Sequence, residues 1–129
     1  MKDLIILAAH LDDFELGCVG YIIRHHKEYD NIRLYVATNN DYKEPITIEN
    51  VKQLSKYIGK DIDYSNFNYG STKLKSQFDD LKDDFYKLID FNSSFDLLTH
   101  DEEDLHTDHT SCSDICLLYT SPSPRDPKI

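Results

Sequence analysis

Leu4 to Gly20 reads LIILAAHLDDFELGCVG, and this stretch near the amino terminus decides the fold. Its first part is a continuous apolar run, which is typical of a parallel strand buried on both faces of a sheet. Its second part opens an amphipathic segment, and His10, Asp12 and Asp13 lie where the two parts meet. Open α/β sheets place their ligand sites at the carboxyl ends of their strands. The stretch therefore predicts a site as well as a fold.

Strand and helix patterns alternate along the chain. Strands are expected at residues 4–7, 32–38, 62–69 and 95–99, and helices at 14–28, 45–58 and 74–89, with a further helix from about Asp108. Such alternation indicates a parallel sheet, and right-handed crossovers place helices on both of its faces. The predicted fold class is α/β, a Rossmann-like three-layer α/β/α sandwich with a mainly parallel sheet.

The composition is that of one globular domain. Hydrophobic residues make up 40% of the 129 positions, enough for a core. The formal net charge of -10 repels phosphate backbones and anionic lipids, which argues against nucleic-acid and membrane partners. The first apolar run is too short to span a membrane, and no small-residue cleavage site follows it. Three cysteines without a Cys-x-x-Cys pair predict no disulfide framework, so we expect a reducing, cytoplasmic location.

The last fourteen residues do not continue the pattern. Cys116 to Asp126 reads CLLYTSPSPRD, which can be back-translated codon by codon into a common transposase sequencing adapter. We therefore expect residues 1–115 to be the natural part of the chain and residues 116–129 to be a non-native tail. A natural polar tail is the alternative.

A second polar cluster, His106-Thr107-Asp108-His109, lies far along the chain. Zinc in catalytic sites takes three protein ligands of imidazole and carboxylate type and leaves one position for water, whose pKa falls to about 7. His10, Asp13 and His109 would supply such a set. Asp12 is then free to act as general base on the water. Taken alone, however, the first cluster also fits a helix cap and the second a solvated loop.

The remaining polar residues of the second cluster have complementary roles in this hypothesis. His106, as an imidazolium, could stabilise an oxyanion or protonate a leaving amine, and Asp108 could hold its useful tautomer. His100 fits the crevice and a plain loop equally well, and Asp101 to Asp104 is expected to be a solvated acidic loop.

The two motifs together resemble the LmbE-like (PIG-L) deacetylases. That family carries Ala-His-Pro-Asp-Asp-x-Glu-x-Gly-Cys-Gly-Gly after its first strand and a later His-x-Asp-His. Here the first motif spans Ala9 to Gly20, with Leu11 in place of proline and Val19 in place of glycine. Family members are longer, so the resemblance implies a sheet and a substrate pocket that are incomplete on the carboxyl-terminal side.

The resemblance also implies roles for individual residues. His10, Asp13 and His109 would bind zinc, Asp12 would be the base, and His106 would stabilise the tetrahedral intermediate. The implied reaction is hydrolysis of the N-acetyl group of an N-acetylglucosamine-type sugar conjugate, a small-molecule substrate. The ligand set also suits other divalent transition metals.

Three other functions stay open at the level of the sequence. A phospho-receiver domain has a similar length and an acidic pair after its first strand, but it needs an aspartate where this chain has Asn66 to Tyr69. A metal-dependent phosphoesterase would need more bridging carboxylates. A non-catalytic nucleotide-binding Rossmann domain would carry Gly-x-Gly-x-x-Gly after its first strand, and this chain does not.

Overall fold

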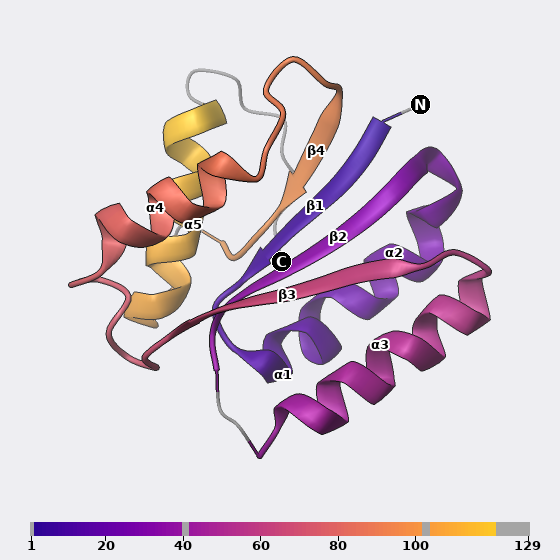
Figure 1. The fold of residues 1–129 in the computed structure, drawn as a ribbon, viewed down its shortest axis with the longest axis horizontal. Helices are drawn as coiled ribbons and strands as arrows, with labels where there is room; N and C mark the ends of the chain where they lie inside the picture. Colours follow the sequence, from indigo (N-terminus) through magenta and orange to yellow (C-terminus); the bar gives the residue numbers. More distant parts are fainter. Residues whose placement is uncertain (1, 40–41, 102–103, 121–129) are drawn as a thin grey trace.

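A parallel four-stranded sheet lies between two layers of helices (Figure 1). The computed structural model describes residues 2–39, 42–101 and 104–120. The strands are β1 (Lys2–Ala8), β2 (Tyr29–Thr38), β3 (Ile62–Tyr69) and β4 (Phe95–Leu98). Their order is β3-β2-β1-β4, and every neighbouring pair is parallel, so the predicted fold class is confirmed. Within the described ranges, no helix has the length and apolar character needed to cross a membrane.

The helices divide between the two faces of the sheet. They are α1 (Leu11–Asp13), α2 (Val19–His25), α3 (Glu44–Ile58), α4 (Phe78–Lys87) and α5 (Thr107–Thr120). Figure 1 shows α1, α2 and α3 on one face and α4 and α5 on the other. A π-helical turn (Phe14–Cys18) joins α1 to α2, and a 3₁₀ turn (His26–Glu28) follows α2.

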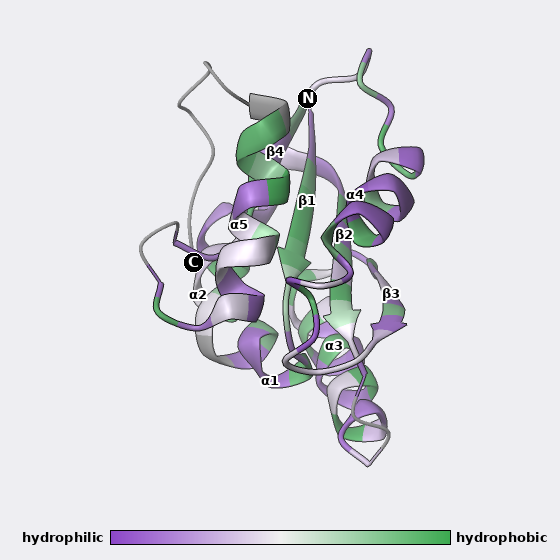
Figure 2. Cartoon of the chain, turned by 90° about the vertical axis from the view of Figure 1, so that its left-hand side faces the viewer, coloured by the Kyte–Doolittle hydropathy of each residue, from purple (hydrophilic) through white to green (hydrophobic). Residues whose placement is uncertain are grey.

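Strand β1 is the centre of the core, and it is hydrophobic along most of its length in Figure 2. Because successive side chains of a strand point to opposite faces, β1 contributes to both halves of the core. Leu4 and Ile6 pack in the cluster beneath α2 and α3. Ile5 and Leu7 pack in the cluster beneath α4 and α5, with Phe85 fully buried among them. The continuous apolar run is thus explained by burial on both faces.

The first helical segment differs from its prediction. A helix was expected over residues 14–28, but helical structure starts at Leu11 and passes through the π-helical turn. The early start follows from the extended backbone of His10, whose N–H donates to Asp13 Oδ2 at 2.8 Å and so closes the first turn. Leu11, which stands where the resembling family has proline, is buried in the core.

Other element boundaries lie close to the expected ones. Pro45 lies in the first turn of α3, and Gly59 ends that helix in the left-handed conformation with a φ of 74°. The helix expected from residue 74 begins at Phe78, because residues 70–77 form turns. Helix α5 extends to Thr120, into the predicted tail; residues 121–129 lie outside the described part of the chain.

The order of the strands defines a switch point beside β1. The chain moves outward from β1 to β2 and β3, and then returns to place β4 on the other side of β1. The connections leaving β1 and β4 therefore diverge to opposite faces of the sheet. The crevice between them is where open α/β sheets bind their ligands.

Candidate active site

The loop after β1 is fixed by the ends of two neighbouring strands. The N–H and the hydroxyl of Thr38, at the end of β2, donate to the carbonyl oxygen of Ala9 at 3.0 and 2.7 Å. On the other side, the Ala9 N–H donates to His100 Nε2 at 3.0 Å, just beyond β4. His10 and Asp13 follow directly, so their backbone position is determined by the sheet.

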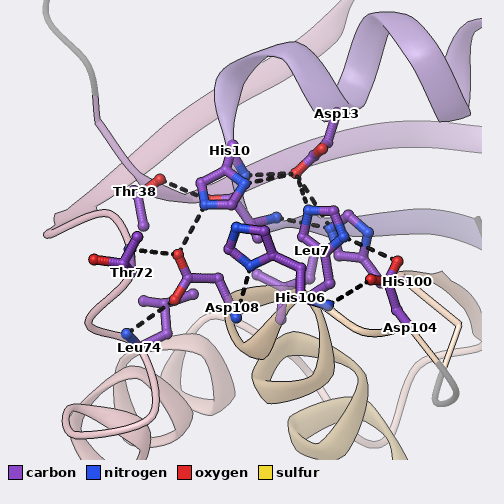
Figure 3. Close-up of polar contacts among 12 residues, drawn as sticks. Leu7, His10, Asp13, Thr38, Thr72, Leu74, His100, Asp104, His106 and Asp108 are labelled. Atoms are coloured by element: carbon purple, nitrogen blue, oxygen red, sulfur yellow. Dashed lines mark hydrogen bonds and ion pairs between the residues drawn. The ribbon is translucent and has the colours of Figure 1, made fainter.

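The three predicted metal ligands lie together. Asp13 Oδ2 is 3.4 Å from His10 Nδ1 and 3.2 Å from His109 Nε2 (Figure 3). One donor atom from each of these residues lies within 4.8 Å of the other two. Two imidazole nitrogens and one carboxylate oxygen at this spacing fit a divalent metal with an open coordination position. The donor set thus fits the metal that the sequence implies.

Asp108 holds His10, not His106 as expected. Its carboxylate is fully buried and accepts from His10 Nε2–H at 2.8 Å. It also accepts the backbone N–H groups of Thr72 (2.6 Å) and Leu74 (3.2 Å). The expectation was wrong because Asp108 points from the first turn of α5 toward the turn at residues 70–74, which the sequence pattern does not position.

His106 obtains its tautomer from the backbone instead. Its Nδ1 accepts the N–H of Asp108 at 3.1 Å, so the neutral ring carries its proton on Nε2. The ring packs against both histidines of the ligand set, with centroid distances of 4.8 Å to His10 and 4.7 Å to His109. His106 is exposed to solvent, which leaves it accessible to a substrate.

Burial and hydrogen bonds together set the protonation of these groups. Burial alone would raise the pKa of Asp13, but the hydrogen bond from His10 and the nearby His100 bring it below its ordinary value. Burial would also raise the pKa of Asp108, but the hydrogen bonds from His10 and from two backbone N–H groups bring it below its ordinary value. The hydrogen bond to Asp13 raises the pKa of His10, although burial acts against it. Both carboxylates are therefore ionised at neutral pH.

Asp12 lines a pocket beside the ligand set. It is exposed, although its neighbour Asp13 is half-buried. The pocket has a volume of about 220 Å³ and is lined by His10, Leu11, Asp12, Thr38, Lys43, Ser71 and His106. Asp12 and His106, the proposed base and the proposed oxyanion-stabilising group, thus line one cavity beside the ligand set.

Two further residues belong to the site, although neither had a predicted role in it. His100 is buried, and its ring is stacked on that of His109 at 3.9 Å with an interplanar angle of 8°. Asp104 was expected in a solvated acidic loop, but its Oδ2 lies 3.0 Å from His109 Nδ1. Asp104-Leu105 resembles part of the family's second motif, but this resemblance does not indicate which side chain Asp104 would contact.

The family model described as PIG-L, GlcNAc-PI de-N-acetylase, matches residues 5–119. The chain belongs to this family. The match covers both motifs and nearly all of the sheet. Because the chain belongs to this family, it is neither a phospho-receiver domain nor a nucleotide-binding domain of the Gly-x-Gly-x-x-Gly type.

Solved structures with this fold include three that cover nearly the whole chain. The conserved protein TT1542 from Thermus thermophilus has a TM-score of 0.64 and 23% identity, over 100% of this chain and 60% of that one. N,N'-diacetylchitobiose deacetylase from Pyrococcus horikoshii has a TM-score of 0.56 and 16% identity, over 95% and 50%. GalB, the 4-carboxy-2-hydroxymuconate hydratase from Pseudomonas putida KT2440, has a TM-score of 0.58 and 15% identity, over 92% and 55%.

These likenesses bear on the fold and on the extent of the chain. At these identities they establish a shared architecture, which hosts both a deacetylase and a hydratase. The chain spans between half and three-fifths of the length of these structures. No curated protein matches the sequence.

Proposed function

We propose that this chain carries the catalytic centre of a metal-dependent N-deacetylase that acts on an N-acetylglucosamine-type sugar conjugate. One observation carries the proposal: His10, Asp13 and His109 converge beside a pocket that Asp12 and His106 line. Membership of the PIG-L family supports the reaction type. The name of the Pyrococcus horikoshii structure, a diacetylchitobiose deacetylase, supports an N-acetylated amino sugar as substrate class.

In this proposal His10, Asp13 and His109 would hold Zn²⁺ or a similar divalent ion. When bound, such an ion lowers the pKa of a water molecule and polarises a carbonyl oxygen. Asp12 accepts a proton from the water as its oxygen bonds to the acetyl carbon. The carbon–nitrogen bond then breaks, the protonated Asp12 transfers this proton to the amine nitrogen, and acetate and a free amino sugar leave.

His106 is suited to the part of the reaction in which charge develops. Because its Nδ1 accepts the Asp108 N–H, its Nε2–H is the group available to a substrate. A neutral Nε2–H donor placed at a carbonyl oxygen stabilises the oxyanion that forms during attack. Its exposure beside Asp12 in the pocket is consistent with this role.

The Asp12→Asn variant tests the proposal. With Zn²⁺ present, we expect acetate release from N-acetylglucosamine and from N,N'-diacetylchitobiose to fall by a factor of about 10²–10⁴, the range for a lost general base. Zinc affinity, measured by calorimetry, should stay within about twofold, because Asp12 is not a ligand. Asp114→Asn, an identical charge change at an exposed position of α5, is the matched control.

Two results would contradict the proposal. If the Asp12→Asn variant released acetate as fast as the wild type, Asp12 would not be the general base. If the wild-type chain bound zinc at His10, Asp13 and His109 but released no acetate from either sugar, the proposed deacetylase function would be wrong.

A metal-dependent phosphoesterase is the second candidate, because three overlapping donor groups surround the site. The group of His10, Asp13 and His109 shares one histidine with each of the other two groups, so it cannot bind one ion while either of them binds a second. In the other two groups, His100 Nε2 already accepts the Ala9 N–H and the Asp108 carboxylate already accepts two backbone N–H groups. We expect a metal-to-protein ratio near one by elemental analysis; a ratio near two with release of phosphate from a phosphoester would favour the alternative.

A further inference from the structure

Asp104 connects the acidic loop to the first turn of α5 by two hydrogen bonds. Its Oδ2 is 3.0 Å from His109 Nδ1, and its Oδ1 accepts the backbone N–H of His106 at 2.9 Å. Figure 3 shows the Asp104 carboxylate at the edge of the histidine cluster. About a third of its side chain is exposed, whereas the Asp108 side chain is fully buried.

Both ring nitrogens of His109 face a carboxylate. Nε2 faces Asp13 at 3.2 Å and Nδ1 faces Asp104 at 3.0 Å. The contact with Asp104 is a hydrogen bond, whereas the contact with Asp13 is an ion-pair distance. Because an ionised carboxylate only accepts, Asp104 stabilises the proton of a neutral His109 on Nδ1. The lone pair of Nε2 then faces the position that the metal would take.

His10 has the same arrangement with its nitrogens exchanged. Nδ1 faces Asp13, and Nε2–H donates to Asp108. Each histidine of the ligand set therefore has a carboxylate on the nitrogen that points away from Asp13. Carboxylates in such positions fix the tautomer of a ligating histidine and make it a stronger ligand.

We propose that Asp104 is a positioning residue for His109. Its carboxylate holds the proton on Nδ1, and the parallel ring of His100, 3.9 Å away, fixes the plane of the imidazole. The bond from Asp104 to the His106 N–H joins this histidine to the same support. The inference rests on the metal site of the proposed function and not on the acetylated substrate.

Zinc affinity and the tautomer of His109 test this inference. For Asp104→Ala we expect a 10- to 100-fold loss of Zn²⁺ affinity, in the range for removal of an outer-shell partner. In the metal-free variant at neutral pH, ¹H–¹⁵N long-range correlation spectra should show His109 moving from the Nδ1–H form toward a mixture of tautomers. Asp104→Asn, which keeps an acceptor oxygen but loses the charge, should give a smaller loss and also covers the case in which the alanine variant does not fold.

Asp114→Asn, on the same helix as His109, is the control and should change neither quantity. A zinc affinity within about twofold of wild type in both Asp104 variants, or an unchanged tautomer, would overturn the inference. Acetate release plays no part in either measurement. If the Asp104 variants lose zinc while the wild-type chain deacetylates neither sugar, the positioning role stands and the proposed substrate falls.

Discussion

Two adjacent carboxylates show how much a single position matters in this site. Neighbouring residues of a helix point about 100° apart, so Asp12 and Asp13 at the start of α1 face different surroundings. Asp13 is directed at His10 and His109, with distances of 3.4 and 3.2 Å. Asp12 is directed at the pocket. One side chain can therefore bind metal while the other can exchange a proton with water.

His100 predicts a pH dependence of stability in the metal-free protein. Burial lowers the pKa of His100 from 6.5 to about 4, so the unfolded chain binds its proton more readily than the folded one. The contribution of neutral His100 to the free energy of unfolding is complete above about pH 6.5 and is lost as the pH falls toward 4. Between about pH 7.5 and about pH 5, linkage gives a loss of about 2 kcal/mol.

Urea unfolding of wild type and His100→Gln in the presence of EDTA checks this. The difference in unfolding free energy between the two proteins should shrink by about 2 kcal/mol from about pH 7.5 to about pH 5. His10, whose raised pKa acts in the opposite direction, is present in both proteins and cancels. A difference that is independent of pH would show that His100 is not buried in its neutral form.

The residues of the candidate ligand set could be identified from the sequence, but the hydrogen bonds that hold them could not. His10 and Asp13 belong to one turn after a recognisable strand, and His109 belongs to a compact second motif. The partners of Asp108, by contrast, include the N–H groups of Thr72 and Leu74, which only the folded loop brings to it. Sequence spacing does not encode such contacts between loops.

At the scale of elements, the turn before α4 includes a strained backbone conformation that reduces the stability of the fold. Thr72 has a φ of 66°, in the left-handed region that β-branched residues avoid. The strained backbone nevertheless directs the Thr72 N–H at Asp108. Strain of this kind persists where the surrounding structure determines the conformation, and here it borders the candidate site.

Thr72→Gly should stabilise the protein by about 0.5–1 kcal/mol, because glycine adopts this conformation freely and the threonine side chain is exposed. Gly59→Ala should do the reverse and destabilise by about 1 kcal/mol: its φ is 74° and no atom lies near an added Cβ, so only the backbone is strained. Urea midpoints of the two variants give the signs. A destabilised Thr72→Gly protein would mean that the threonine side chain stabilises the turn.

Strands were predicted more accurately than helix starts. An apolar run buried on both faces, as in β1, has a distinct composition, and β3 begins and ends where its pattern does. The helices at residues 11–25 and 78–87 begin at other residues than predicted. Local hydrogen bonds, at His10 and within residues 70–77, determine where they begin. These bonds depend on the backbone of the preceding loops and leave little trace in hydrophobic periodicity.

At the scale of the whole molecule, the proposed metal site couples the two ends of the chain. His10 and Asp13 follow the first strand, and His109 lies on the last helix. Unfolding separates them, so metal binding should stabilise the folded state. With free Zn²⁺ at roughly 100 times its dissociation constant, the expected gain is about 2.7 kcal/mol.

Urea unfolding with Zn²⁺ and with EDTA measures this gain. In the His109→Ala variant the gain should largely disappear. The three cysteines, which are buried in the fold, become available to zinc in the unfolded chain of both proteins, so the comparison removes their effect. An equal gain in both proteins would place the ion elsewhere.

The fold class was predictable because the alternation of strands and helices permits few topologies. The position of β4 beside β1 is not contained in that alternation. It comes from tertiary packing, in which Leu97 joins Ile5 and Phe85 in one cluster. That placement brings the second motif to the crevice.

The bond from the Ala9 N–H to His100 Nε2 joins residues 91 positions apart. Strands β1, β2 and β3 can pair through successive local crossovers, but β4 must close a much longer loop, which is slower. We therefore expect the crevice to form in the refolding step that pairs β4 with β1. The exchange rate of the Ala9 amide proton with deuterium reports that step, since the proton is released when β4 leaves β1.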